Sequence, residues 1–228
     1  MSLVVRIKGK RLKQKLTKDL LQEEAKRFSE IESKHKEPNL FGVTDGKAVG
    51  TYLEHKFQAY LQKKYDYIVG NSAKGIDFPE LFVDMKVTSI KQPQSSCPFK
   101  SARQKIFGLG YSLLVFVYEK TDDQSDNTGR LDIKHTIFVN DFRTADYQTT
   151  SGIVKILDNK GNKDDLIAFF QERMLPVDEI EANRIAEELL KNKPIVGYLT
   201  ISNALQWRLQ YSHVIQEAGA IDGVVRVK

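Results

Sequence analysis

The sequence predicts a mixed α/β fold, in which a central sheet is flanked by helices and followed by a mainly helical C-terminal part. Three observations support this fold class. Apolar residues recur at three- and four-residue steps in the first third of the chain, as in amphipathic helices. Short apolar runs bounded by turn residues follow, as in strands. Helical periodicity returns after residue 162. This order of elements favours one mixed core with a helical appendage.

The N-terminal third is expected to form two helices, at 12–33 and 47–64. The segment between them, "HKEPNLFGVTDG", contains Pro38, Gly42 and Gly46, which interrupt a helical pattern. A boundary between the two helices is therefore expected there.

Strands are expected in the middle of the chain, at 65–70, 81–88, 112–119 and 131–139, with one helix at 100–109. Residues 120–130, "KTDDQSDNTGR", are rich in turn formers and poor in apolar residues, and are expected to form a loop. Residues 140–162 are expected to be irregular. Helices are expected at 164–174, 177–192 and 200–216, and a strand at 224–227.

From these elements we expect three parts: a basic N-terminal helical segment (1–45), a core (46–140) and a mainly helical C-terminal part (141–228). The three parts are also compatible with one continuous domain. The length of 228 residues is sufficient for a sizeable hydrophobic core without disulfides.

Composition and charge narrow the function classes. Cys97 is the single cysteine, which excludes an internal disulfide and a cysteine-based zinc site. No apolar run approaches the roughly 18 residues of a membrane span, and the N-terminus has no signal-peptide pattern, so a cytoplasmic protein is expected. The net charge is +5, and seven Lys or Arg residues precede the first acidic residue, Asp19. Such a block suits a polyanionic partner or a solvated terminus.

A carboxylate, one residue and a lysine occur at seven positions, but only Asp84 and Asp132 begin such a tripeptide on an expected strand. There, residues i and i+2 point to the same face, so Asp84 lies beside Lys86 and Asp132 beside Lys134. Asp77 precedes Asp84 across a tight connection, and a short hairpin would bring the two carboxylates together. The alternative for either pair is a solvated strand face with an ion pair.

Two converging carboxylates suit Mg²⁺, which takes oxygen ligands, keeps several waters and binds substrate phosphates. A neighbouring lysine can orient or deprotonate a water molecule. Asp84 is preferred over Asp132, because Asp132 follows a polar loop with three aspartates that offers no rigid second carboxylate.

The segments Gly75-Ile76-Asp77 and Asp84-Met85-Lys86 resemble the signature of the PD-(D/E)XK nuclease superfamily, with Ile76 in place of the usual proline. The resemblance implies a restriction-endonuclease-like core. It also implies Mg²⁺ bound by Asp77, Asp84 and the backbone carbonyl of Met85, with Lys86 as a catalytic residue. A glutamate on the preceding helix often completes such sites, and Glu54 is the match.

Within the superfamily, the chain resembles a type II restriction endonuclease, which implies double-stranded DNA as substrate and a homodimer matching a palindromic site. Another nuclease of the superfamily, such as a junction resolvase or repair nuclease, and a non-catalytic DNA-binding protein of the same fold are the alternatives. Side chains suited to base edges and phosphates follow the signature. The residues expected to contact DNA are Lys91, Gln92, Gln94, Ser95, Ser96, Lys100, Arg103 and Gln104.

Overall fold

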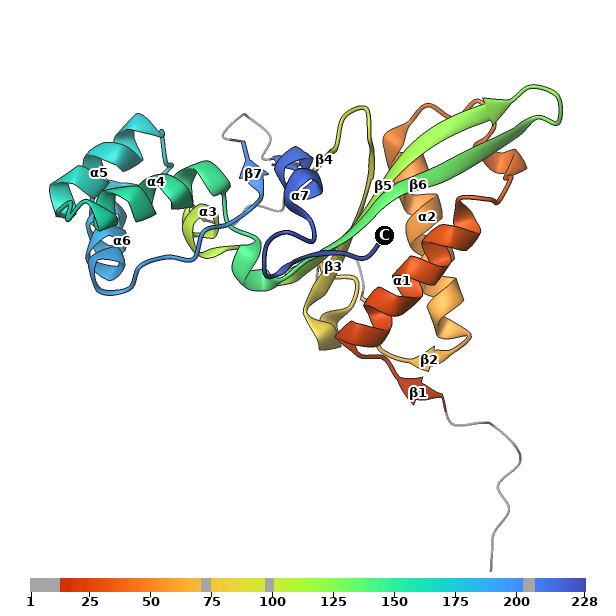
Figure 1. Cartoon of the computed structure of the whole chain (residues 1–228), viewed down its shortest axis with the longest axis horizontal. Helices are drawn as coiled ribbons and strands as arrows, with labels where there is room; N and C mark the ends of the chain where they lie inside the picture. Colours follow the sequence, from red (N-terminus) through yellow and green to blue (C-terminus); the bar gives the residue numbers. More distant parts are fainter. Residues whose placement is uncertain (1–12, 71–74, 97–100, 203–207) are drawn as a thin grey trace, which may run out of the picture.

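The computed structural model describes residues 13–70, 75–96, 101–202 and 208–228. The helices are α1 (Lys18–Glu32), α2 (Gly46–Gln62), α3 (Arg103–Phe107), α4 (Tyr147–Asp158), α5 (Lys163–Glu172), α6 (Glu179–Lys191) and α7 (Ser212–Glu217). The strands are β1 (Gln14–Lys15), β2 (Tyr65–Asp66), β3 (Val83–Ser89), β4 (Gln94–Ser96), β5 (Ser112–Asp123), β6 (Thr128–Val139), β7 (Thr200–Ile201), β8 (Arg208–Gln210) and β9 (Val224–Arg226). The expected mixed α/β fold with a central sheet and helices is confirmed (Figure 1).

The central sheet has the strand order β3-β5-β6-β9. β3 and β5 are parallel, whereas the β5–β6 and β6–β9 pairs are antiparallel, so the sheet is mixed. The parallel pair requires a crossover connection, and the segment that contains β4 and α3 provides it. β3 lies at one edge of the sheet.

Helices α1 and α2 cover one face of the sheet (Figure 1). Thr17 and Asp45 cap their N-termini by accepting hydrogen bonds from backbone N–H groups. Phe28 of α1 and Phe57 of α2 both pack against Phe116 of β5, with ring centroids 6.1 and 5.2 Å away. The first hydrophobic core therefore fixes α2 over β3 and β5.

The opposite face of the sheet is covered by α7 and by a second, three-stranded sheet of order β4-β8-β7. Leu113 and Val115 of β5 share this second core with Leu209 and Val214, and all four are fully buried. Helices α3 to α6 form a third core at one end of the long axis of the molecule (Figure 1).

Four expectations about elements were wrong. The strand expected at 65–70 is limited to the two residues of β2. Residues 147–158 form α4 instead of an irregular segment. The helix expected at 200–216 is replaced by β7, β8 and the short α7 in the part of that segment that the structure describes. The loop expected at 120–130 is the end of a long β5–β6 hairpin, in which pairing continues to Asp123 and Thr128.

No helix in the described ranges is long and apolar enough to cross a membrane.

Candidate active site

The alternation of β3 separates an apolar row from a polar row. Val83, Met85 and Val87 belong to the first core, beneath α2. Asp84 and Lys86 point to the other face, in register with Leu113 and Val115 of β5. Asp84 is only 3% exposed. The Lys86 side chain is 20% exposed, and its Nζ lies 2.8 Å from Oδ2 of Asp84. The strand thus holds a buried carboxylate beside a lysine that solvent can reach.

Asp77 is brought to β3 by a tight turn. An isolated bridge joins Phe78 to Val83, and Oδ2 of Asp77 accepts a hydrogen bond of 2.8 Å from the Met85 backbone N–H. Phe82 closes the turn with a left-handed φ of 52°. This conformation is unfavourable for a bulky residue and costs on the order of 1 kcal/mol. The turn therefore holds the Asp77 carboxylate at the beginning of β3 against local strain.

Glu54 lies on α2, beside the residues that pack on β3. Gly50 of the same helix faces Val87, and a Cβ atom at Gly50 would lie 3.9 Å from the Val87 Cβ. Burial and the charge of Asp77 raise the pKa of Glu54 to about 7, although Lys86 acts in the opposite direction. The carboxyl group of Glu54 is therefore within electrostatic range of the β3 site.

The site carries more negative than positive charge. Burial raises the pKa of Asp84 to about 7, and contact with Asp77 adds to this rise against the pull of Lys86. Oδ2 of Asp84 is buried and lacks a partner with hydrogen-bond geometry, although Lys86 Nζ is close to it. A carboxylate cluster with raised pKa values is one that a bound cation would stabilise.

The donors fit Mg²⁺ better than a metal that requires a complete protein cage. Among the described residues, no group of three or more His, Cys, Asp or Glu side chains could hold a metal ion. Mg²⁺ needs only one or two carboxylates, because waters and substrate phosphates complete its octahedron. Asp77 and Asp84, with the Met85 carbonyl between Asp84 and Lys86, match that requirement.

The same electrostatics predicts how stability depends on pH. A carboxyl group whose pKa is higher in the folded than in the unfolded state contributes stability at low pH, and this contribution is lost as pH rises through the folded value. For Asp84 that loss occurs between about pH 4 and about pH 7. In metal-free buffer, Asp84→Asn should therefore gain stability relative to wild type as pH rises from about 5 to about 8.

Urea unfolding at both pH values measures this change, and Asp132→Asn is the matched control. The pKa of Asp132 is lowered, chiefly by a hydrogen bond from Lys134, so its contribution should be the same at both pH values. A relative stability of Asp84→Asn that does not change with pH would contradict the buried-carboxylate interpretation.

The rival pair Asp132 and Lys134 has a different environment. The two side chains are 33% and 37% exposed, and Lys134 Nζ lies 2.6 Å from Asp132 and 3.0 Å from Glu119 across the strand pair. Both carboxylates are thus paired with a lysine at the surface, where such ion pairs contribute little to stability. This arrangement matches a solvated strand face.

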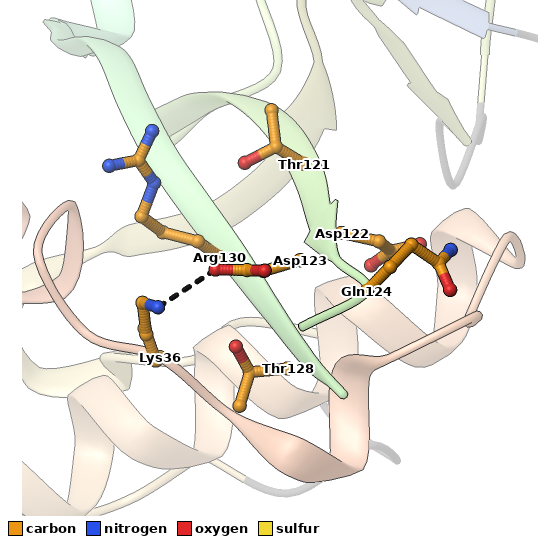
Figure 2. A pocket seen from close by; sticks show the side chains of 7 residues that line it. All are labelled: Lys36, Thr121, Asp122, Asp123, Gln124, Thr128 and Arg130. Atoms are coloured by element: carbon orange, nitrogen blue, oxygen red, sulfur yellow. Dashed lines mark hydrogen bonds and ion pairs between the residues drawn. The ribbon is translucent and has the colours of Figure 1, made fainter. Parts of the chain in front are cut away.

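A pocket at the far end of the β5–β6 hairpin also carries acidic residues. Figure 2 shows Lys36, Asp123 and Arg130 among its lining side chains, with Lys36 paired to Asp123. The Lys36 Nζ lies 2.9 Å from Asp123 and 2.6 Å from Asp126. Hydrogen bonds from Ser125 and from Lys36 lower the pKa of Asp123. The two aspartates that line this pocket are thus each paired with a lysine, Asp123 with Lys36 and Asp122 with Lys120.

The residues expected to contact DNA fall into several environments. Lys91 and Gln92 are exposed in the turn between β3 and β4, while Gln94, Ser95 and Ser96 form β4. Ser95 is oriented inward, with its Oγ 2.6 Å from the Tyr211 hydroxyl. Arg103 and Gln104 lie on α3. Lys100 lies outside the described residues.

Arg103 forms ion pairs with two glutamates of α6. Its guanidinium lies 2.6 Å from Glu188 and 3.5 Å from Glu181 of α6, and it stacks on Phe107. A contact between Arg103 and DNA would require these ion pairs to be exchanged.

Sequence reasoning missed Thr88, which continues the polar row of Asp84 and Lys86. The Thr88 Oγ1 accepts a hydrogen bond of 2.9 Å from the Gln94 N–H and donates to carbonyl oxygens in the same turn. The period-two alternation of β3 contains this signal, because residues 84, 86 and 88 share one face. Thr88 fixes β4 beside the candidate site.

The comparisons with known proteins address the class of the protein. The family model "Type II restriction enzyme NspV" matches residues 15–226. The type II restriction enzyme NspV of Nostoc sp. (strain ATCC 29411 / PCC 7524) is 65% identical over 212 residues, which cover 93% of this chain and 96% of that protein. No solved structure matches the chain.

These matches define the class as type II restriction enzymes, which are endodeoxyribonucleases. Within that class, the chain belongs to the NspV family. The expectation of a type II restriction endonuclease is thereby confirmed.

Proposed function

We propose that this chain cleaves double-stranded DNA at a specific sequence by Mg²⁺-dependent phosphodiester hydrolysis, and that the active centre lies at the start of β3. The observation that carries this proposal is the buried Asp84 carboxylate, which lies 2.8 Å from the Lys86 Nζ. The Asp77 carboxylate is held at the same strand, because it accepts a hydrogen bond from the Met85 backbone N–H. The relationship to NspV supplies the substrate class, and the β3 geometry supplies a site that suits it.

The residues around β3 have distinct roles in this proposal. Asp77, Asp84 and the Met85 carbonyl would hold Mg²⁺, which when bound would offset charge on the phosphate and acidify water. Lys86 reaches solvent from the same strand face and orients the attacking water or takes its proton. Glu54, with its pKa raised to about 7, exchanges a proton near neutral pH and supports the centre from α2.

The finer fold assignment is also part of the proposal. Asp84 and Lys86 lie on the edge strand β3, which is parallel to β5 and lies under α2. This arrangement agrees with a restriction-endonuclease-like core. The DNA contacts are proposed to come from the turn and strand at 91–96, with Lys100, Arg103 and Gln104 at the end of the same segment.

A homodimer is proposed because one centre at one strand edge can hydrolyse only one phosphodiester at a time. Two copies related by a two-fold axis would address the two strands of a palindromic site. Sedimentation of the protein on a short duplex containing one site should give two protein chains per duplex. One chain per duplex, together with full double-strand cleavage, would contradict this arrangement.

The metal dependence is tested with a sequenced plasmid. Discrete fragments should appear with Mg²⁺, and cleavage should stop after EDTA dialysis and return when Mg²⁺ is added. Sequencing of the fragment ends gives the recognition site. The same fragments at the same rate in EDTA would contradict a Mg²⁺ centre built from Asp77 and Asp84.

A further inference from the structure

The small β4-β8-β7 sheet has one face made entirely of polar side chains. Its register places Gln94 beside Gln210, and Gln210 beside Thr200, in one row across three strands. Ser96 lies beside Arg208, and the Ser202 N–H donates to the Arg208 carbonyl at 3.1 Å, so a second polar row runs parallel to the first. Between them lies the row Ser95, Leu209 and Ile201.

The middle row identifies the inner face of this sheet. Leu209 is fully buried and Ile201 is 3% exposed, and both belong to the second core. Ser95 bonds to the Tyr211 hydroxyl on the same side. Because neighbouring residues of a strand point to opposite faces, the two polar rows point away from that core. Their side chains are all at least partly exposed.

The polar face is tied directly to the candidate active centre. Thr88 holds both the N–H and the carbonyl group of Gln94 through its hydroxyl. Thr88 lies two residues after Lys86 on the same face of β3, which is also the face of the central sheet that the small sheet covers. The row beginning at Gln94 therefore starts next to the row that carries the catalytic pair.

The side-chain amides of Gln94 and Gln210 are available for a ligand. Within the described ranges, neither amide has a hydrogen-bond partner in the protein, although both are partly sheltered from solvent. The backbones of paired strands, and therefore of Gln94 and Gln210, lie about 5 Å apart. Successive base pairs of DNA are spaced about 3.4 Å along the helix axis. Long side chains can bridge that difference.

We propose that this polar face is the base-reading surface of the enzyme, and that Gln94 and Gln210 recognise adenines in the major groove of the DNA. This inference rests on the proposed function. A glutamine amide presents one donor and one acceptor, which match the N7 acceptor and N6 donor of adenine. The major groove admits two paired strands, and both glutamines lie on the paired strands β4 and β8. Attachment through Thr88 fixes the distance between the bases that are read and the phosphodiester that is cut.

The test uses Gln94→Ala and Gln210→Ala in the full chain, with Gln124→Ala as the matched control. Gln124 is an exposed glutamine at the tip of the β5–β6 hairpin, away from the small sheet. Each small-sheet variant should lose about 10- to 100-fold in cleavage at the mapped site, as expected for a lost base contact. Binding to a duplex without the site should change less than about twofold, because phosphate contacts dominate it.

A base-analogue experiment identifies the contact. Replacing one adenine of the site by 7-deazaadenine removes the N7 acceptor. At the contacted adenine, this replacement should slow cleavage by wild type and by the Gln124→Ala control. It should cause little further loss of cleavage rate in the variant that lacks the contacting glutamine. Gln94→Asn and Gln210→Asn keep the amide but shorten it, and should show the same pattern if the alanine variants fold poorly in thermal unfolding.

The outcomes separate this inference from the proposed function. Metal-independent cleavage by wild type contradicts the proposed function. A second outcome concerns the base-reading assignment alone. Wild type would cleave only with Mg²⁺, but all small-sheet variants would cut the mapped site and its single-base variants at wild-type rates. That result overturns the base-reading assignment and leaves the proposed function intact. The assignment is also overturned if, at every adenine of the site, the loss of cleavage rate from 7-deazaadenine adds in full to the loss from the glutamine substitution.

Discussion

Replacing Lys86 by alanine, or Asp84 by alanine or asparagine, is expected to lower the rate of DNA cleavage by about a thousandfold or more. Asp84 is the buried carboxylate of the proposed metal site, and Lys86 is the positive group that reaches it at 2.8 Å. Without Asp84 one metal ligand is lost. Without Lys86 the attacking water loses its positioning group. Single-turnover cleavage of a duplex with one mapped site, at saturating enzyme, measures the chemical step.

The folding of these variants needs its own control, since removing one partner of a buried ion pair can cost about 3 kcal/mol or more. Asp84→Asn keeps the shape of the side chain and removes the charge, so it should fold and remain inactive. Asp132→Asn and Lys134→Ala are the matched pair, because they occupy the same i and i+2 positions on a strand with a 2.6 Å ion pair. Both should cut at nearly wild-type rates. Full activity of folded Lys86→Ala, with loss in Lys134→Ala, would move the active centre to β6.

The central elements could be predicted because local pattern and tertiary environment agree there. The run at Leu113 to Val117 is apolar throughout, and the structure buries it on both faces of the sheet. The i, i+2 placement of Asp84 and Lys86 follows from strand geometry alone once β3 is identified. The family resemblance and the alternation of β3 point to the same residues.

The C-terminal errors have physical causes. Ile201, Leu205 and Leu209 recur every four residues, which mimics one face of a helix, although Ile201 and Leu209 are also separated by an even number of residues, as on a strand. Pairing of β8 with the distant β4, and of β7 with β8, decides between the two, and a single sequence does not contain the long-range pairing.

Helix α4 was missed because its first turns are polar. The sequence "DYQTTSG" reads as a turn. In the structure the Asp146 carboxylate caps the helix at the Thr149 N–H, and its other oxygen accepts from the distant Ile201 N–H. Buried hydrogen bonds, instead of an apolar stripe, hold this turn in place, and they depend on tertiary contacts.

The candidate site depends on two features that the sequence does not display. The left-handed conformation of Phe82 closes the turn that brings Asp77 to the Met85 N–H, and phenylalanine is an unusual residue for it. Glu54 borders the apolar stripe of α2, a position where an acidic residue usually has no functional role. Burial in the folded chain, followed by the charge of Asp77, raises its pKa.

The second large effect is expected in binding without cleavage. In the proposed active centre, Asp77, Asp84 and Glu54 place up to three negative charges where a DNA phosphate would approach. Like charges about 4 Å apart at a partly buried site interact by on the order of 4 kcal/mol. A divalent cation reverses the sign of that interaction. Adding Ca²⁺ should therefore tighten site-specific binding by about a hundredfold or more over EDTA, while supporting little cleavage, because its larger and looser coordination sphere positions water poorly.

Fluorescence anisotropy on a duplex with the mapped site, at matched ionic strength, measures this effect. Asp84→Asn should bind more tightly than wild type in EDTA and gain less from Ca²⁺, because it lacks one repelling charge and one ligand. Asp132→Asn should show the full wild-type gain. The gain should also shrink as pH falls below about 7, since Glu54 and Asp84 then take up protons and repel the phosphate less. Equal wild-type affinities with Ca²⁺ and with EDTA at about pH 8 would contradict a carboxylate metal site at the DNA backbone.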